Sequence, residues 1–192
     1  MLKDYINEIY LASQSPARLE LLRKQGLEVH ACPQFCEEFT SETEPGKVVE
    51  SLSLQKLDSF IKSPDFKENC TALACDTLLY FNGKLIGKAH SSKEAQKQIE
   101  ELAGNTHQVY SGYSLYYKKK IYHGFDYADV KFSPISEKDI IAYIDSNEWK
   151  GAAGSYHLFG KAVDFIEKVD GDVNTVIGLP LRTIEKTIGN LK

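Results

Sequence analysis

Ser13-Gln14-Ser15-Pro16-Ala17-Arg18 is the stretch that decides how the first strand of this chain passes into its first helix. The apolar run at 9–12 before it predicts a buried strand, and the spaced leucines after it predict a short amphipathic helix ending at Gly26. Ser15 suits the N-cap of this helix. Pro16 suits its first position, because the N–H that proline lacks would have no partner there.

A strand, a tight turn and a helix start together suit an anion. The N–H groups of the first helical turn point out of the turn, with the positive end of the helix dipole behind them. Arg18, at the third helical position, can add two parallel donors for a phosphate. An ordinary capped helix is the alternative interpretation, because most capped helices bind nothing.

The composition is that of an ordinary globular chain. Its 192 residues are 42% apolar and 26% charged, which suits one domain or two fused lobes. No apolar run approaches the ~20 residues of a membrane span. The N-terminus lacks a signal-peptide core, so we expect a cytoplasmic protein without a membrane partner. A formal net charge of −4 gives no sign of a nucleic-acid partner.

The four cysteines are at positions 32, 36, 70 and 75, and their spacing does not match a zinc knuckle. We expect them to be reduced thiols.

The rest of the chain alternates between helical and strand patterns. The expected strands are 28–31, 108–117, 121–132 and 162–169, and the expected helices begin near Pro45, Ser91, Ser136 and Pro180. In the helix after Ser136, the isoleucines at 140, 141 and 144 are predicted to face inward. Lys56 lies one turn beyond Leu52, near the apolar face of its helix. Its ammonium can extend to solvent or reach across a cleft, and the first is commoner.

Asp76 is the residue that fits its surroundings least. It interrupts an apolar strand at 71–75, which ends at Asp76-Thr77 and resumes at 78–81. A carboxylate in such a run is costly unless it is paired or bound to a cation. A structural aspartate with satisfied hydrogen bonds is the alternative.

Cations and acids are both available for phosphoryl chemistry. Arg18, Lys56 and Lys88 can face a polyphosphate, and Glu37 and Asp76 can bind Mg²⁺ or Mn²⁺. The metal would polarise the phosphate and activate a water. The sequence does not show that these five residues converge.

The chain resembles the Maf family of nucleoside triphosphate pyrophosphatases over nearly its full length. Any one matching segment is weak, but ten in the family's order are a specific signal. They are Leu11-Ala12-Ser13-Gln14-Ser15-Pro16-Ala17-Arg18, Glu37, Lys56, Ala74-Cys75-Asp76-Thr77, Ile86-Gly87-Lys88, Leu102-Ala103-Gly104, Tyr110-Ser111-Gly112, Glu148-Trp149, Ala153-Gly154-Ser155-Tyr156 and Asn174-Thr175-Val176-Ile177-Gly178-Leu179-Pro180-Leu181.

This resemblance implies an α/β fold, with an elongated, bent, mixed sheet flanked by helices and two lobes around a central cleft, as in inosine triphosphate pyrophosphatases. Residues 1–192 would form one such domain. The implied reaction is metal-dependent hydrolysis of a nucleoside triphosphate between the α and β phosphates, which gives the monophosphate and pyrophosphate and removes non-standard or excess nucleotides. A homodimer is a further expectation from the family.

The resemblance also assigns roles to residues. Ser13, Ser15 and Arg18 would hold phosphate, and Lys56 and Lys88 would neutralise its charge. Glu37 and Asp76 would bind the metal. Asp76 would also accept a proton from the attacking water, and the two roles compete in part because metal binding weakens a carboxylate as a base.

The departures from the family concern substrate choice. Ala17 replaces an arginine of the phosphate loop, Cys36 replaces an acid beside Glu37, and Ala89 replaces the proline of a Gly-Lys-Pro segment. Thr77 agrees with the dTTP/UTP branch. Phe159 stands where that branch has glutamine, and Gly154-Ser155 resembles the 7-methyl-GTP branch, so the preferred base is left open.

Two other function classes remain open. A non-catalytic regulator would use the same nucleotide site as a sensor, as the family's association with arrested septum formation suggests. A structural α/β domain without a site would require five coincidental charged residues, and buried charge without a use is costly.

Overall fold

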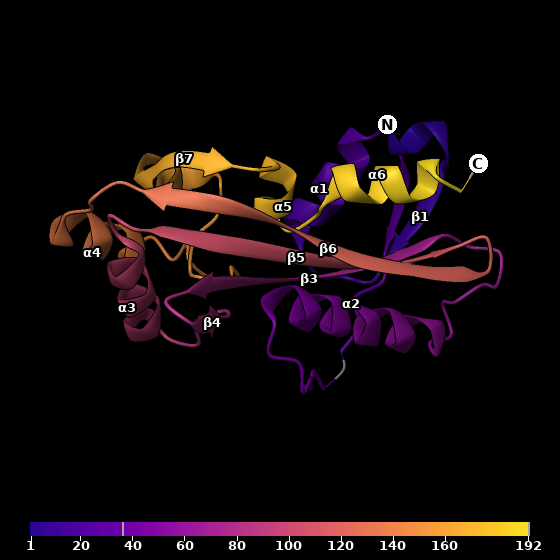
Figure 1. The fold of residues 1–192 in the computed structure, drawn as a ribbon, viewed down its shortest axis with the longest axis horizontal. Coiled ribbons are helices and arrows are strands. Elements are labelled where there is room, and N and C mark those ends of the chain that lie inside the picture. The colour runs from indigo at the N-terminus through magenta and orange to yellow at the C-terminus, as the bar shows by residue number, and fades with distance from the viewer. Residues whose placement is uncertain (36, 192) are drawn as a thin grey trace. The chain divides into compact units, whose positions relative to one another are not determined.

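The computed structural model describes residues 1–35 and 37–191. The chain forms two compact units (Figure 1). Unit 1 comprises Met1–Asp76, Ser111–Asp126 and Gly178–Lys192, and unit 2 comprises Thr77–Tyr110 and Tyr127–Ile177.

One mixed sheet supplies strands to both units. Its order is β2-β1-β3-β5-β6-β7, with β4 paired to β3. The strands are β1 (Glu8–Leu11), β2 (Glu28–Ala31), β3 (Ala72–Phe81), β4 (Lys84–Ile86), β5 (Thr106–Tyr117), β6 (Lys120–Phe132) and β7 (Ile166–Asp170). β1 pairs in parallel with β2 and β3, whereas β3–β4 and β6–β7 are antiparallel. The predicted mixed α/β class is therefore confirmed.

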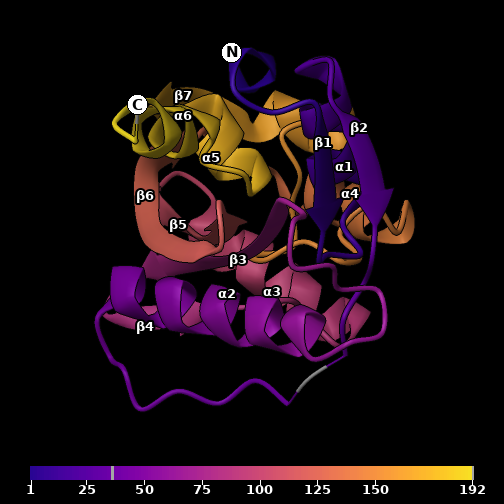
Figure 2. The same ribbon diagram turned by 90° about the vertical axis from the view of Figure 1, so that its right-hand side faces the viewer.

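In unit 1, helices cover both faces of the strands. α2 (Pro45–Ile61) lies on one face, and α1 (Pro16–Lys24) and α6 (Leu181–Gly189) pack on the other (Figures 1 and 2). Side chains of β5 alternate accordingly: Tyr113 and Leu115 pack with α6, and Tyr116 packs with α2. The same alternation in β3 sends Ala72 and Ala74 toward α2.

Gly112 lets α2 approach the sheet closely. A Cβ at this position would lie 2.3 Å from the carbonyl oxygen of Val49 in α2. Only glycine leaves room for such an approach. The helix is held further by the buried hydrogen bond between Ser53 and Ser114 of β5, whose hydroxyl oxygens are 2.8 Å apart.

Unit 2 has a separate core. Its helices are α3 (Ser92–Leu102), α4 (Glu137–Asp145) and α5 (Val173–Ile177), with the 3₁₀ helix η2 (Gly160–Phe165) before β7. Ile99, Phe132, Tyr143 and Trp149 are among its buried side chains. Ser91 caps α3 by accepting a hydrogen bond from the backbone N–H of Glu94.

Several local predictions hold, three need correction, and two short elements were not predicted. The strand at 28–31, the helix from Pro45 and the two long strands expected at 108–117 and 121–132 are confirmed. β3, however, runs unbroken through Asp76. Residues 162–165 form a 3₁₀ helix rather than a strand, and Ile141 is 45% exposed rather than inward. The sequence pattern also missed η1 (Leu2–Asp4) and α5. Among the described residues, no helix is long and apolar enough to span a membrane.

Candidate active site

The turn between β1 and α1 has the predicted geometry. Ser15 is the N-cap and Pro16 the first helical residue. The Ser15 hydroxyl accepts from the backbone N–H of Arg18 at 3.4 Å, and the backbone N–H of Ser15 donates to the Ser13 hydroxyl at 3.2 Å. The two serines thus fix the turn. Ala17 occupies the second helical position and carries no polar group beyond its backbone.

The Arg18 guanidinium binds three groups of the chain itself. Its Nε donates to the carbonyl of Gly178 at 2.7 Å, and its Nη1 donates to the carbonyl of Cys75 at 2.8 Å and to the Ser13 hydroxyl at 3.2 Å. Arg18 therefore ties α1 to β3 and to the segment before α6. This structural role was not predicted, because the carbonyls lie 57 and 160 residues away in sequence.

Arg18→Lys is expected to destabilise the protein by about 1–3 kcal/mol, because an ammonium cannot reach all three acceptors and leaves buried carbonyls without a donor. Urea denaturation of the two proteins measures this difference. Arg23→Lys, an exposed change on the same helix, serves as the control and should leave the midpoint unchanged. A midpoint equal to wild type for Arg18→Lys would contradict the structural role.

Lys56 and Asp76 meet between α2 and β3. Asp76 follows Ala72 and Ala74 on the face of β3 that α2 covers, and Lys56 lies on the buried face of α2, one turn before Phe60. The Lys56 ammonium hydrogen-bonds Asp76 Oδ1 and lies 3.1 Å from Glu38 Oε1. The Asp76 side chain is only 10% exposed and that of Lys56 17%. Lys56 therefore pairs inside the protein rather than extending to solvent, and the buried acid has its cation.

Glu38, rather than its neighbour Glu37, is the loop acid that reaches Lys56. The Glu37 side chain is exposed. Cys36, where the family pattern has an acid, lies outside the described residues. Glu37 was predicted from the family resemblance, and no spacing in the sequence distinguishes it from the adjacent Glu38.

Cys75 lies beside this site but is not a nucleophile. Its side chain is fully buried, and burial raises the pKa of its thiol to about 11, although Arg18 and Lys56 act in the opposite direction. Cys32, Cys70 and Cys75 are all free thiols, as expected.

The donor set fits a hard divalent cation of the Mg²⁺ type. Carboxylate oxygens from the loop and from β3 already converge on one positive charge, the Lys56 ammonium. The described residues contain no group of three or more metal-binding side chains. Mg²⁺ is commonly held by one or two carboxylates, with water and substrate phosphates supplying the remaining oxygens. Asp76 and the loop acids match that pattern.

The other predicted residues belong to unit 2. Lys88 is exposed and forms an isolated β-bridge with Ala153. Phe159 is 52% exposed, and its ring stacks on His157 with centroids 4.7 Å apart. Thr77 is half-buried in β3, directly after Asp76. Their roles toward a nucleotide stay predictions.

Gly154 and Ser155 form a constrained small-residue loop in unit 2. Both have positive φ, and a Cβ on Gly154 would lie 2.2 Å from Leu79 Cδ2. The buried Ser155 hydroxyl donates to Gln98 Oε1 at 2.6 Å, and its carbonyl accepts from the Tyr143 hydroxyl. These contacts account for the small residues by packing.

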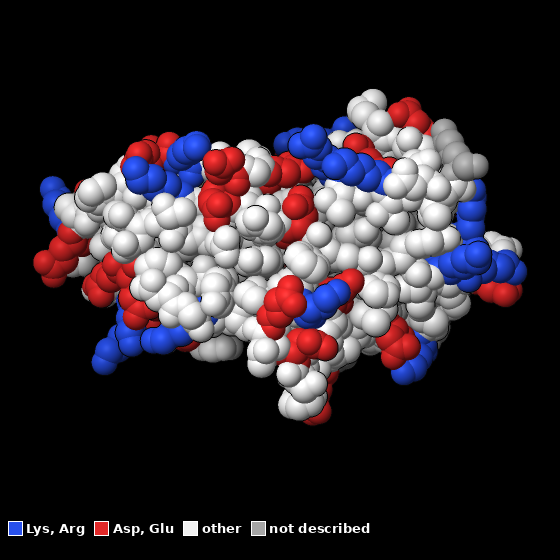
Figure 3. Space-filling view, in the orientation of Figure 1, with Lys and Arg blue, Asp and Glu red and all other residues white. Residues whose placement is uncertain are grey.

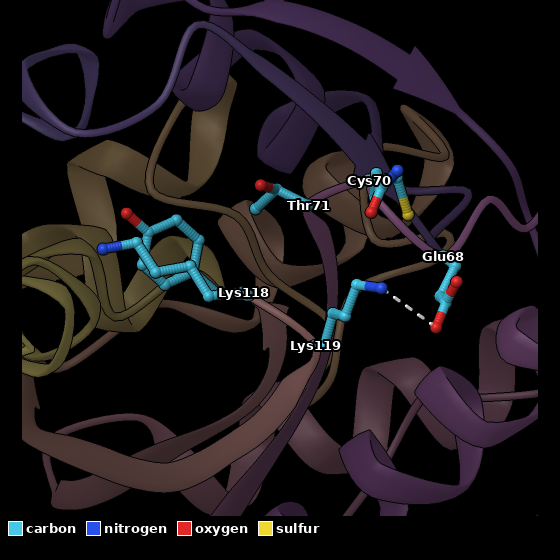
Figure 4. Close-up of a pocket in the computed structure, with 7 residues that line it drawn as sticks. Glu68, Cys70, Thr71, Lys118 and Lys119 are labelled. Carbon is cyan, nitrogen blue, oxygen red and sulfur yellow. Dashed lines mark ion pairs between the residues drawn. The ribbon is translucent and has the colours of Figure 1, made fainter.

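A surface hollow of about 390 Å³ lies elsewhere in unit 1, at the β5–β6 turn (Figure 4). Lys119 and Glu68 form an ion pair at 3.1 Å on its wall. None of the predicted site residues lines it. The cluster of Lys56, Asp76 and Glu38, rather than this hollow, is therefore the candidate active site.

The family profile described as "Maf-like protein" matches residues 8–191. The chain belongs to the Maf family. It is 34% identical over 176 residues to the dTTP/UTP pyrophosphatase of Pyrococcus horikoshii, with 92% of each chain covered. It is 35% identical over 184 residues to the enzyme of the same name from Pyrococcus furiosus, with 95% of each covered. The match therefore includes every residue of the candidate site.

Structural similarity adds little to this assignment. The solved Staphylococcus aureus Ham1 protein has a TM-score of 0.47 and 17% identity, over 66% of this chain and 72% of that one. The sequence-based membership of the Maf family is the stronger finding, and it confirms the resemblance seen in the motifs.

Proposed function

We propose that this protein is a nucleoside triphosphate pyrophosphatase that cleaves its substrate between the α and β phosphates. The observation that carries the proposal is the buried Asp76, which is paired with Lys56 and immediately follows the residue whose carbonyl binds Arg18. Cys75 and Asp76 of β3 thus bring together the carboxylate of Asp76, the ammonium of Lys56 and the first turn of α1, which carries Arg18. This arrangement suits hydrolysis of a phosphate anhydride.

In this proposal, the triphosphate lies against the N-terminus of α1, where the backbone N–H groups and the Ser13 hydroxyl meet its negative charge. A water attacks the α phosphorus, and its proton passes to the carboxylate of Asp76. The bridging oxygen leaves with its electron pair on pyrophosphate. Lys56 neutralises part of the charge that develops on the phosphate oxygens.

A divalent cation, Mg²⁺ or Mn²⁺, would be held by Asp76 together with Glu37 or Glu38, and would supply Lewis-acid polarisation of the phosphate. The hydrogen bond between the Lys56 ammonium and Asp76 would then be weaker. The role of Lys88 toward the phosphate chain stays a prediction of the sequence. A cytoplasmic location and a homodimer stay predictions of the sequence.

The charge on one face of the molecule does not suggest a nucleic-acid-binding surface. On the face shown in Figure 3, basic and acidic side chains are interspersed instead of separated into a basic stripe. Nucleic-acid-binding surfaces usually concentrate lysine and arginine.

We expect the preferred substrates to be dTTP and UTP. Two Pyrococcus relatives are named for these substrates, and Thr77 follows Asp76 here as in that branch. The test is pyrophosphate release with Mg²⁺ and Mn²⁺ across dTTP, UTP, CTP, GTP, ATP and methylated or deaminated analogues. A purine or 7-methylated substrate that exceeds dTTP and UTP would overturn the base assignment. Nucleotide binding without pyrophosphate release would favour the regulator instead.

A further inference from the structure

Gln55 of α2 holds the backbone of Phe39 with both ends of its side-chain amide. Its Nε2 donates to the Phe39 carbonyl at 2.7 Å, and its Oε1 accepts from the Phe39 N–H at 3.1 Å. A third hydrogen bond, from Nε2 to the Ser51 hydroxyl at 3.3 Å, fixes the amide from within the helix. The glutamine thus binds one loop residue as a neighbouring strand would.

This contact lies next to the candidate active site in both segments. Phe39 follows Glu38, and Gln55 precedes Lys56. The two neighbours form the ion pair at 3.1 Å described above. Holding the backbone of residue 39 therefore determines where the carboxylate of residue 38 can lie.

Apolar packing does not hold this part of the loop. The Phe39 side chain is 80% exposed and that of Phe35 is 87% exposed. Besides the ion pair between Glu38 and Lys56, a side-chain hydrogen bond from the Ser59 hydroxyl to Gln34 Oε1 at 3.4 Å also joins the loop to α2. The bond from Ser59 is longer than the two bonds from Gln55, and Gln34 lies further from Glu38 in the sequence than Phe39 does. The Gln55 amide is the stronger restraint.

A glutamine is required for this contact, because only a primary amide offers a donor and an acceptor on adjacent atoms. Methionine keeps a similar length but has neither. Glutamate keeps the acceptor for the Phe39 N–H but places a charge against the Phe39 carbonyl. Gln55→Met therefore removes both hydrogen bonds to Phe39, and Gln55→Glu removes one of them.

We infer that Gln55 is a positioning residue, which fixes Glu38 opposite Lys56 and Asp76 so that the carboxylates of Glu38 and Asp76 can share a divalent cation. The inference rests on the proposed function. Residues that orient metal ligands typically account for about 10–100-fold in metal affinity or activity. The half-saturating Mn²⁺ concentration should rise by about this factor when the hydrogen bonds between the Gln55 amide and Phe39 are removed.

The experiment compares Gln55→Met and Gln55→Glu with wild type and with Ser51→Ala, which removes only the third hydrogen bond. Without nucleotide, hydrogen exchange of the Phe39 amide and chymotrypsin cleavage at Phe35 and Phe39 report the loop directly. With dTTP and UTP, pyrophosphate release is measured over a Mn²⁺ series. Free Mn²⁺ binding is followed separately by electron paramagnetic resonance.

We expect Gln55→Met to exchange and cleave faster, to need more Mn²⁺, and to recover most of its kcat at saturating metal. Gln55→Glu should lie between Gln55→Met and wild type in loop exchange, and Ser51→Ala should match wild type. Unchanged loop exchange, or a loss of kcat that saturating Mn²⁺ does not restore, would overturn the inference. If wild type releases no pyrophosphate, the proposed function fails, while the exchange and Mn²⁺-binding measurements still decide the role of Gln55.

Discussion

Asp76→Asn is expected to lower pyrophosphate release by about 10²–10⁴-fold, the usual contribution of a positioned general base. The amide keeps nearly the shape of the carboxylate but cannot accept the proton of an attacking water. The substitution also removes one of the two carboxylates that pair with the Lys56 ammonium. The substitution therefore affects the chemistry at the phosphate more than the packing of β3.

The protein should remain folded in this variant. Asp76 is 7% exposed within a continuous strand, so a change of shape there would be costly, but asparagine avoids it. Lys56 keeps Glu38 as its partner, so the buried ammonium is not left without an anion. Far-ultraviolet circular dichroism and the thermal unfolding midpoint measure whether Asp76→Asn is folded as wild type is.

Glu68→Gln is the matched control for Asp76→Asn. It makes the same carboxylate-to-amide change in an exposed ion pair with Lys119 at the β5–β6 turn. Exposed pairs contribute little, so activity and stability should stay near wild type. Turnover at the wild-type rate by Asp76→Asn would remove Asp76 from the reaction and with it the proposed mechanism.

His107 should make the protein unstable in acid. It is buried in unit 2, where its Nε2 lies 2.8 Å from the Tyr156 hydroxyl and its ring meets Phe132 edge-on. Its Nδ1 has no hydrogen-bond partner among the described residues. Burial lowers the pKa of His107 from 6.5 to about 4, because the charged ring would lose its hydration.

The direction of the effect follows from linkage. The imidazole is neutral in the folded protein and gains its proton more readily in the unfolded chain. Its contribution to stability is therefore complete above pH 6.5 and is lost as the pH falls toward 4. The loss amounts to about 3 kcal/mol, from the difference between the two pKa values.

Urea denaturation between pH 7 and pH 4 tests this on His107→Gln, whose amide can still bond the Tyr156 hydroxyl but does not titrate. The variant should lose less stability than wild type between pH 6.5 and 4.5. His90→Gln, an exposed histidine of the same unit, should follow the wild-type curve. Parallel curves for wild type and His107→Gln would contradict a neutral buried imidazole.

Local sequence determined much of this fold. Ser15 and Pro16 start α1 by capping and fixed backbone geometry, and both act within a few residues. The hairpin turns at Asn82-Gly83 and Lys118-Lys119 adopt positive φ, which short β-hairpin turns require. The misplaced strand at 162–165 and the exposed Ile141 are errors of the same local kind, because an apolar pattern does not reveal which neighbour it will face.

The sequence alone indicated that Asp76 needs a partner, either a cation or hydrogen-bond donors, because a carboxylate in an apolar strand is too costly to leave unpaired. Only the tertiary structure decided which one. Lys56 lies 20 residues away and pairs because β3 and α2 present these side chains to each other. Arg18 is bound to carbonyls 57 and 160 residues away, and Gln55 to a loop residue 16 away. Such partners are set by the packing of distant segments, whose geometry no local propensity contains.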